Sequence, residues 1–299
     1  MKKALLILVL ILALIAPTAA LAGGSTASTA CKTKYPVVLA HGMAFSAQIL
    51  GMVDYWYGIP SALKGEGAKV YVTSVNGMDG TTAKATSFRR QVLDILAASG
   101  SSKVNIINHS HGALYSRMAM SNMGLGSKVA SWTSMSGVNH GSAMADLLVG
   151  GTLPSWLVSA GSSIIDFVYA FVMGDTNPDS LQNGLDLTRD YVNNVFNPNT
   201  PNVSGVYYQS YAAAARYSCP SVVLEATWIA LLAMEGQNDG MVSVTSSKWG
   251  NYRGVQNGAW WSPGVDHCNI VGHLFGFTPG FDAPGFYVSV VKDLKGRGY

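Results

Sequence analysis

The sequence has few charged residues, few cysteines and no internal repeat. Charged side chains make up 12% of its 299 residues, against about 25% in an average soluble protein. No basic stripe is present, so we expect no nucleic-acid partner. Neither Cys-x-x-Cys nor His-Glu-x-x-His occurs, so the sequence predicts neither a dithiol redox site nor the common zinc-protease site.

The longest unbroken apolar run stands at the N-terminus. The basic Met1–Lys3 precedes the apolar Ala4–Ala16, and Ala20-Leu21-Ala22 follows. This is the pattern of a secretory signal peptide with an Ala-x-Ala cleavage site. The alternative is a permanent anchor, but the apolar run is shorter than the roughly 20 residues that a membrane span needs. We therefore expect residues 1–22 to be a cleaved signal peptide and the protein to be exported through the periplasm.

A strand that ends sharply at a serine stands near the middle of the chain. The β-branched residues of Val104–Ile107 are typical of a buried strand, and helical spacing begins after Gly112. Ser110 with Gly112 matches the nucleophile elbow of α/β-hydrolases. Asn108 stands where Gly is usual, and Asn tolerates unusual backbone angles. On these residues alone, an ordinary strand-to-helix turn capped by Ser is the alternative.

An earlier strand supplies candidates for an oxyanion hole. Tyr35–Ala40 predicts a buried strand that runs into His41-Gly42-Met43, where α/β-hydrolases place a backbone N–H donor. We predict that the N–H groups of Met43 and His111 stabilise the negative oxygen of a tetrahedral intermediate. The alternative is a loop with a glycine turn.

Two polar loops late in the chain complete a catalytic set. Asp239 follows the apolar run Thr227–Met234, which we predict to be a strand. The order Ser, acid, His is that of α/β-hydrolases, and we prefer His267 to His273 as the base because the latter precedes residues suited to a buried turn. A neutral imidazole would take the proton of Ser110, and Asp239 would fix its tautomer. An Asp-Gly turn is the alternative role for Asp239.

Strands and helices alternate along the chain. Lys69–Thr73 predicts a second strand, Phe88–Leu96 an amphipathic helix and Phe286–Leu294 a closing helix. This alternation predicts an α/β fold with a mostly parallel central sheet flanked by helices, in a single domain over residues 23–299. The apolar stretch Leu147–Gly174 is either core or a helical lid.

Several segments together resemble the bacterial true lipases of the Pseudomonas and Burkholderia kind. The resemblance returns over Gly236–Phe275, and the segments that carry it before then are Tyr35–Met43, Asp54–Pro60, Gly67–Thr73 and Lys103–Gly112. It implies the α/β-hydrolase fold with a helical lid insertion over residues 143–175.

The resemblance fails at the calcium site that these lipases usually hold. Asn269 stands at one ligand position, and the region of another ligand holds Cys219, so we expect no metal and no cofactor. We hypothesise instead that a Cys219–Cys268 disulfide tethers the histidine loop, which would leave Cys31 unpaired. Some relatives need a foldase chaperone, so such a partner is possible here.

The sequence thus predicts a secreted, monomeric triacylglycerol lipase that cleaves long-chain acyl esters at a water–lipid interface through a Ser-His-Asp acyl-enzyme mechanism. One alternative is an esterase of short-chain soluble esters or a polyester depolymerase, although the apolar middle of the chain disfavours small soluble esters. Another is a non-catalytic secreted binding protein on a hydrolase scaffold, which the complete order of triad residues disfavours.

Overall fold

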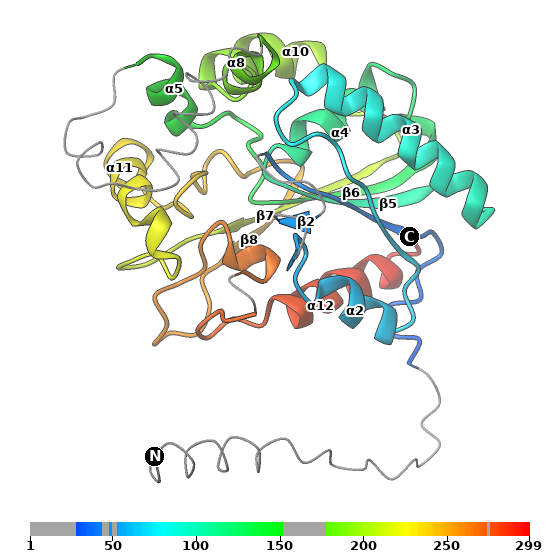
Figure 1. The fold of residues 1–299 in the computed structure, drawn as a ribbon. Helices are drawn as coiled ribbons and strands as arrows, with labels where there is room; N and C mark the ends of the chain where they lie inside the picture. The colour runs from blue at the N-terminus through cyan, green and yellow to red at the C-terminus, as the bar shows by residue number, and fades with distance from the viewer. Residues whose placement is uncertain (1–27, 44–47, 50–52, 152–177, 274–275) are drawn as a thin grey trace, which may run out of the picture.

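The computed structural model describes residues 28–43, 48–49, 53–151, 178–273 and 276–299 (Figure 1). The expected signal peptide and most of the expected lid lie outside these described residues. Among the described helices, none combines the length and the apolar character needed to cross a membrane.

A six-stranded sheet with the order β4-β1-β5-β6-β7-β8 forms the centre of the fold. All neighbouring strands in it run parallel, so their carboxyl ends meet at one edge. The predicted α/β class and parallel sheet are confirmed. The strands are β1 (Val37–Ala40), β4 (Val70–Val72), β5 (Val104–His109), β6 (Val129–Met135), β7 (Tyr207–Ala213) and β8 (Asn251–Gln256), and the short β2 (Gln48–Ile49) and β3 (Val53–Asp54) pair separately and antiparallel.

Helices cover both faces of the sheet. Figure 1 shows α3 (Thr81–Ser99) and α4 (Gly112–Ser121) on one face, and α2 (Ile59–Gly65) and α12 (Ala283–Gly296) on the other. Successive residues of β1 therefore pack into different cores, on the α2–α12 face or on the α3–α4 face. Burial on both faces explains why the strands read as continuous apolar runs rather than alternating ones.

The other helices of the described residues have three to eleven residues. They are η1 (Gly126–Lys128), α5 (Ala143–Val149), α8 (Pro178–Leu185), α9 (Arg189–Tyr191), η2 (Val192–Phe196), α10 (Asn197–Asn199), η3 (Val222–Leu224), α11 (Glu225–Glu235) and η4 (Asn269–Val271). α5 and α8 contact each other, and α11 contacts α5.

The prediction of a strand over Thr227–Met234 is wrong, because these residues belong to α11. The segment is rich in Ala, Leu and Met, which favour helix, and β-branched residues are few. Trp228 and Leu231 are buried whereas Ile229 and Leu232 are exposed. A surface helix that leaves apolar residues exposed therefore shows the same uninterrupted apolar run as a buried strand.

Candidate active site

Ser110 occupies the tight turn between β5 and α4. Its φ of 57° lies in the left-handed region, a strained conformation for a residue other than glycine. A Cβ at Gly112 would lie 2.5 Å from the carbonyl oxygen of Ala40, so only glycine fits there. Asn108 is buried and donates a hydrogen bond from Nδ2 to the carbonyl oxygen of Thr133 at 2.9 Å. The elbow thus forms with Asn in the position usually held by Gly.

Asp239 and His267 form a hydrogen-bonded pair, with 2.7 Å between Oδ2 and Nδ1. The other carboxylate oxygen of Asp239 accepts from the backbone N–H groups of Met241 at 3.0 Å and Val242 at 2.7 Å. Asp239 is fully buried, and in all three of these contacts its carboxylate oxygens are the acceptors. The carboxylate therefore holds the Nδ1–H tautomer of His267 and leaves Nε2 as a proton acceptor.

The ring of His267 lies against the nucleophile elbow. Its centroid is 4.3 Å from that of His109, the residue directly before Ser110. No hydrogen bond between Ser110 Oγ and His267 is found within the described ranges, and such contacts often tighten only when substrate binds. His273 is held elsewhere, with Nε2 3.0 Å from the carbonyl oxygen of Asp54.

Tyr55 connects the elbow to the loop after β1, a role that sequence reasoning missed. Its hydroxyl lies 2.5 Å from His109 Nδ1 and accepts a hydrogen bond from the N–H of Gly42 at 3.0 Å. Burial lowers the pKa of His109 well below its ordinary value, so this imidazole is neutral. A Cβ at Gly42 would lie 2.7 Å from Ser110 Cβ. The loop backbone therefore packs directly on the serine, and the only sequence signal for Tyr55 was its position in a segment that resembles the lipases.

The two candidate oxyanion donors are the backbone N–H groups of Met43 and His111. Met43 follows β1, and His111 caps α4. Neither backbone N–H has a hydrogen-bond partner in the part of the chain that the structure describes. The His111 ring is buried, with Nε2 2.8 Å from Thr81 Oγ1 and Nδ1 3.0 Å from Lys84 Nζ.

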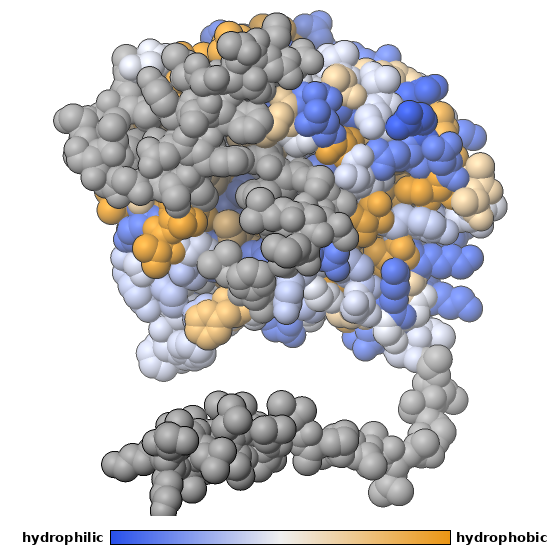
Figure 2. Space-filling view, in the orientation of Figure 1, coloured by the Kyte–Doolittle hydropathy of each residue, from blue (hydrophilic) through white to orange (hydrophobic). Residues whose placement is uncertain are grey.

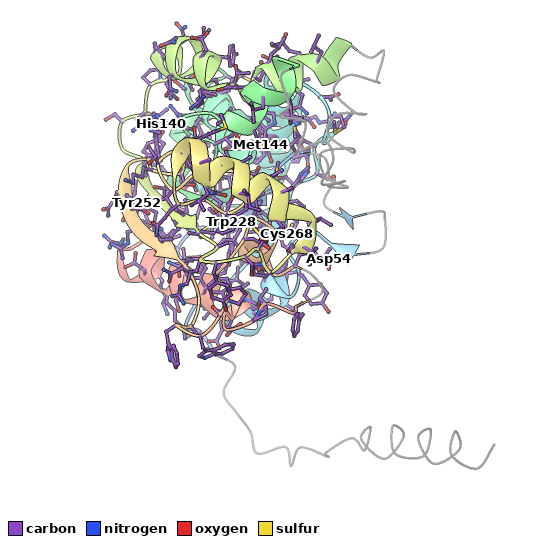
Figure 3. All side chains as sticks on the ribbon, turned by 90° about the vertical axis from the view of Figure 1, so that its left-hand side faces the viewer. Asp54, His140, Met144, Trp228, Tyr252 and Cys268 are labelled. Atoms are coloured by element: carbon purple, nitrogen blue, oxygen red, sulfur yellow. The ribbon has the colours of Figure 1, made fainter. Side chains whose placement is uncertain are left out.

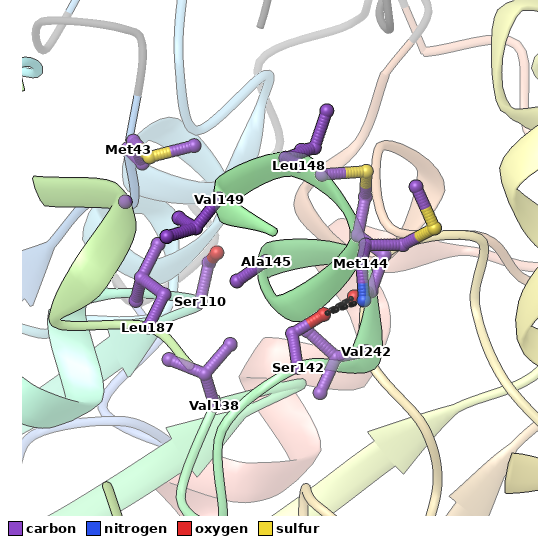
Figure 4. Close-up of a pocket in the computed structure, with 12 residues that line it drawn as sticks. Met43, Ser110, Val138, Ser142, Met144, Ala145, Leu148, Val149, Leu187 and Val242 are labelled. Carbon is purple, nitrogen blue, oxygen red and sulfur yellow. Dashed lines mark hydrogen bonds between the residues drawn. The ribbon is translucent and has the colours of Figure 1, made fainter. Parts of the chain in front are cut away.

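A pocket with about 510 Å³ of empty space, part of it open to solvent, lies beside Ser110. Figure 4 shows the Ser110 hydroxyl directed into it. Its walls are mostly apolar and suit a hydrocarbon group. The lining residues are Met43, Ser110, Val138, Ser142, Met144, Ala145, Leu148, Val149, Gly184, Leu187, Met241 and Val242.

The residues around the histidine loop do not fit a calcium ion, which takes six to eight oxygen ligands. The buried carboxylate of Asp266 accepts instead from three backbone N–H groups, those of Ser221 at 2.6 Å, Cys268 at 2.9 Å and Asn269 at 2.8 Å. Asn269 donates its amide to the carbonyl oxygen of His273. Among the described residues, no cluster of three or more His, Cys, Asp or Glu side chains could hold a metal.

The predicted Cys219–Cys268 disulfide is wrong for this structure, since all three cysteines are free thiols. Cys219 and Cys268 pack in one apolar cluster with Trp228, and Figure 3 shows Trp228 and Cys268 on the same side of the molecule. Burial raises the pKa of both thiols, which disfavours the thiolate needed for disulfide exchange. One link between the two segments is the Asp266 carboxylate, which joins Ser221 to the histidine loop.

Comparison with known proteins shows the family and the fold. A family model described as the alpha/beta hydrolase fold matches residues 35–162. A triacylglycerol lipase of Vibrio cholerae is 33% identical over 242 residues, which cover 73% of this chain and 75% of that one. A triacylglycerol lipase of Burkholderia plantarii is 41% identical over 125 residues, covering 41% of this chain and 34% of the relative.

Solved structures share the fold. The mature lipase BlEst2 of Bacillus licheniformis superposes with a TM-score of 0.65 at 16% identity, over 88% of this chain and 93% of that one. A metagenomic carboxyl esterase gives 0.62 at 16% identity, over 94% and 80% of the two chains. The parallel sheet and the strained serine elbow define an α/β-hydrolase. Within that superfamily the chain belongs to the bacterial triacylglycerol lipases, and it is a serine ester hydrolase.

Proposed function

We propose that the protein is a secreted lipase that cleaves long-chain acyl esters of glycerol through a covalent intermediate on Ser110. The observation that carries this proposal is the Asp239–His267 pair, whose imidazole packs beside the serine elbow. A buried carboxylate that orients an imidazole next to a strained serine has few uses other than acyl transfer.

The proposed reaction starts with attack of Ser110 Oγ on the ester carbonyl carbon, while His267 Nε2 takes the hydroxyl proton. The carbonyl oxygen becomes an oxyanion that accepts from the N–H groups of Met43 and His111. The intermediate collapses, the C–O bond to the alcohol breaks, and His267 returns the proton to the leaving oxygen. Water then attacks the acyl-enzyme with the same imidazole as base, releasing the fatty acid and restoring the serine.

Apolar surface beside the pocket supports long-chain substrates at a lipid surface. Val222, Ile229, Leu232 and Met234 are exposed on η3 and α11. Figure 2 shows hydrophobic side chains at the left edge of this face, where Figure 1 draws α11. Since α11 packs on α5 and α5 lines the pocket, a lipid surface docked on α11 would bring its acyl chains to the site.

We further propose that residues 143–175 form a lid over the pocket, of which the structure describes α5. In this proposal residues 1–22 direct export and are removed, and the mature protein acts as a monomer without calcium or another cofactor. A foldase chaperone, which some of the lipases that the sequence resembles need, is a candidate partner.

Hydrolysis of p-nitrophenyl esters from acetate to palmitate, together with triacylglycerol emulsions, tests the proposal. We expect turnover that persists beyond butyrate and rises where the substrate forms an emulsion. A rate that falls for acyl chains longer than butyrate and does not rise with the emulsion would indicate an esterase of soluble esters. Release of monomers from a polyester film, without hydrolysis of the emulsion, would indicate a depolymerase. Absence of any turnover would indicate a binding protein. The control Ser110→Ala should lose at least about three orders of magnitude in kcat.

A further inference from the structure

Lys84 is a buried cation next to the elbow. It lies in α3 with none of its surface exposed. Its ammonium nitrogen is 2.9 Å from the carbonyl oxygen of Gly77, 3.0 Å from His111 Nδ1 and 3.4 Å from Asn183 Oδ1. A buried ammonium loses its hydration and is retained only where its donors find partners. The three acceptors match the three donors of a lysine side chain.

The contact with Lys84 fixes the tautomer of His111. An ammonium group can only donate, so His111 Nδ1 must be the acceptor. The ring proton is then on Nε2, which donates to Thr81 Oγ1 at 2.8 Å. Burial, reinforced by the charge of Lys84, lowers the pKa of His111 well below its ordinary value, so the ring is neutral. Both ring nitrogens are therefore held, and the residue that carries a candidate oxyanion donor has a single orientation.

The same network reaches α8, which contributes to the pocket. Asn183 donates from Nδ2 to the carbonyl oxygen of Gly77 at 3.3 Å. Asp186, just beyond α8, accepts from the N–H of Thr81 at 2.7 Å. Both side chains are buried, and Gly184 between them lines the pocket. One hydrogen-bond network thus joins the start of α3, the His111 ring and one wall of the pocket.

We propose that Lys84 is a positioning residue for the oxyanion hole, whose ammonium orients His111 and couples that orientation to the docking of α8. This inference rests on the proposed function, since it needs His111 to donate to the oxyanion. Lys84 contacts the His111 ring and not the reacting atoms, so its effect on turnover is indirect. Because the ammonium charge strengthens its hydrogen bond to Nδ1, loss of that proton weakens the restraint.

The surroundings of Lys84 place this proton loss near neutral pH. Burial lowers the pKa of Lys84 to about 7, and the charges of Asp79 and Asp186 oppose that shift. The other titratable groups that face it are His111 and His41, and burial lowers the pKa of both, to about 4 for His41. These imidazoles stay neutral, so the change in charge at alkaline pH is that of Lys84.

Lys84→Met tests the proposal, with Arg90→Met as the matched control because Arg90 is an exposed cation on the same helix. We expect kcat on a p-nitrophenyl ester to fall about 10- to 100-fold, less than the 10²- to 10³-fold cost of a deleted donor. KM should stay within about twofold, and phosphonylation of Ser110 by a p-nitrophenyl phosphonate should slow in parallel. The wild-type kcat should decline above about pH 7, and this decline should disappear in Lys84→Met.

A kcat for Lys84→Met within about twofold of wild type, with the same alkaline decline, would overturn the proposal. If Lys84→Met does not fold, Thr81→Val decides, since it keeps the side-chain shape but removes the acceptor of His111 Nε2. A lowered kcat at unchanged KM supports the proposal, and a wild-type kcat refutes it. A wild-type protein that neither hydrolyses esters nor reacts with the phosphonate would refute the proposed function itself.

Discussion

The carboxylate of Asp239 lies 2.7 Å from the imidazole of His267, a residue 28 positions further along the chain. The two are also joined through the backbone, because the N–H of His267 donates to the carbonyl oxygen of Asp239 at 2.8 Å. The side-chain contact is therefore built into the packing of the two loops, and the imidazole is oriented before any substrate binds.

Replacing Asp239 by Asn should lower kcat by about 10⁴-fold with little change in KM. The amide would donate where the carboxylate accepts, so it would favour the wrong tautomer of His267. Steady-state kinetics on a p-nitrophenyl ester measure the effect, and Asp94→Asn, at an exposed position on α3, is the control. A loss smaller than tenfold would mean that Asp239 has no catalytic role.

Replacing Gly42 by Ala should lower kcat by about 10²-fold, because the added methyl group would press on the serine. Its Cβ would come within 2.7 Å of Ser110 Cβ and 2.8 Å of the Tyr55 hydroxyl oxygen, and small displacements of reacting groups carry costs of that size. Gly65→Ala is the matched control, since a Cβ there meets no atom within 4 Å. Equal activity of the two variants would show that the loop after β1 can yield without disturbing Ser110.

Replacing Asp266 by Asn should lower the free energy of unfolding by about 1–3 kcal/mol, the cost of one buried donor left without a partner. Asn supplies a single acceptor oxygen, whereas the carboxylate serves the N–H of Ser221 and those of two residues in the histidine loop. Urea unfolding followed by tryptophan fluorescence gives the difference. An unchanged midpoint would mean that the histidine loop is held by other contacts.

Chelation should leave both activity and the thermal midpoint unchanged. The histidine loop is tethered by Asp266, whose oxygens already face three backbone N–H groups. The measurement compares the protein before and after dialysis against EDTA, and then again after calcium is restored. Inactivation by EDTA that only calcium reverses would contradict the expectation.

The free energy of unfolding should rise between about pH 7 and about pH 10. Burial lowers the pKa of Lys84 to about 7 in the folded protein, whereas an unfolded lysine titrates near 10.4. Between these two pKa values the unfolded chain binds more protons than the folded protein, so the free energy of unfolding increases with pH. The same contribution to stability is lost as the pH falls through the folded-state pKa. Urea unfolding at several pH values measures the slope, which should be smaller in Lys84→Met. Identical slopes would show that Lys84 is not a buried ammonium.

The elements nearest the chemistry were the easiest to predict from the sequence. The strand and turn around Ser110 and the helices at 88–96 and 286–294 have strong local patterns, and the structure confirms them. α11 was misjudged because its apolar composition reflects a surface position beside the pocket. The Lys84–His111 contact could not be predicted either, since 27 positions separate the two residues and only the packing of α3 on α4 brings them together.

Gly112 packs directly against the carbonyl oxygen of Ala40. This contact limits which residues the enzyme can accept at position 112. A larger residue there would have to separate β1 from β5, so a mutant library at this position should return glycine alone. Engineering of acyl preference is better directed at wall residues such as Leu148 and Leu187, where side-chain volume can vary while the central sheet keeps its register.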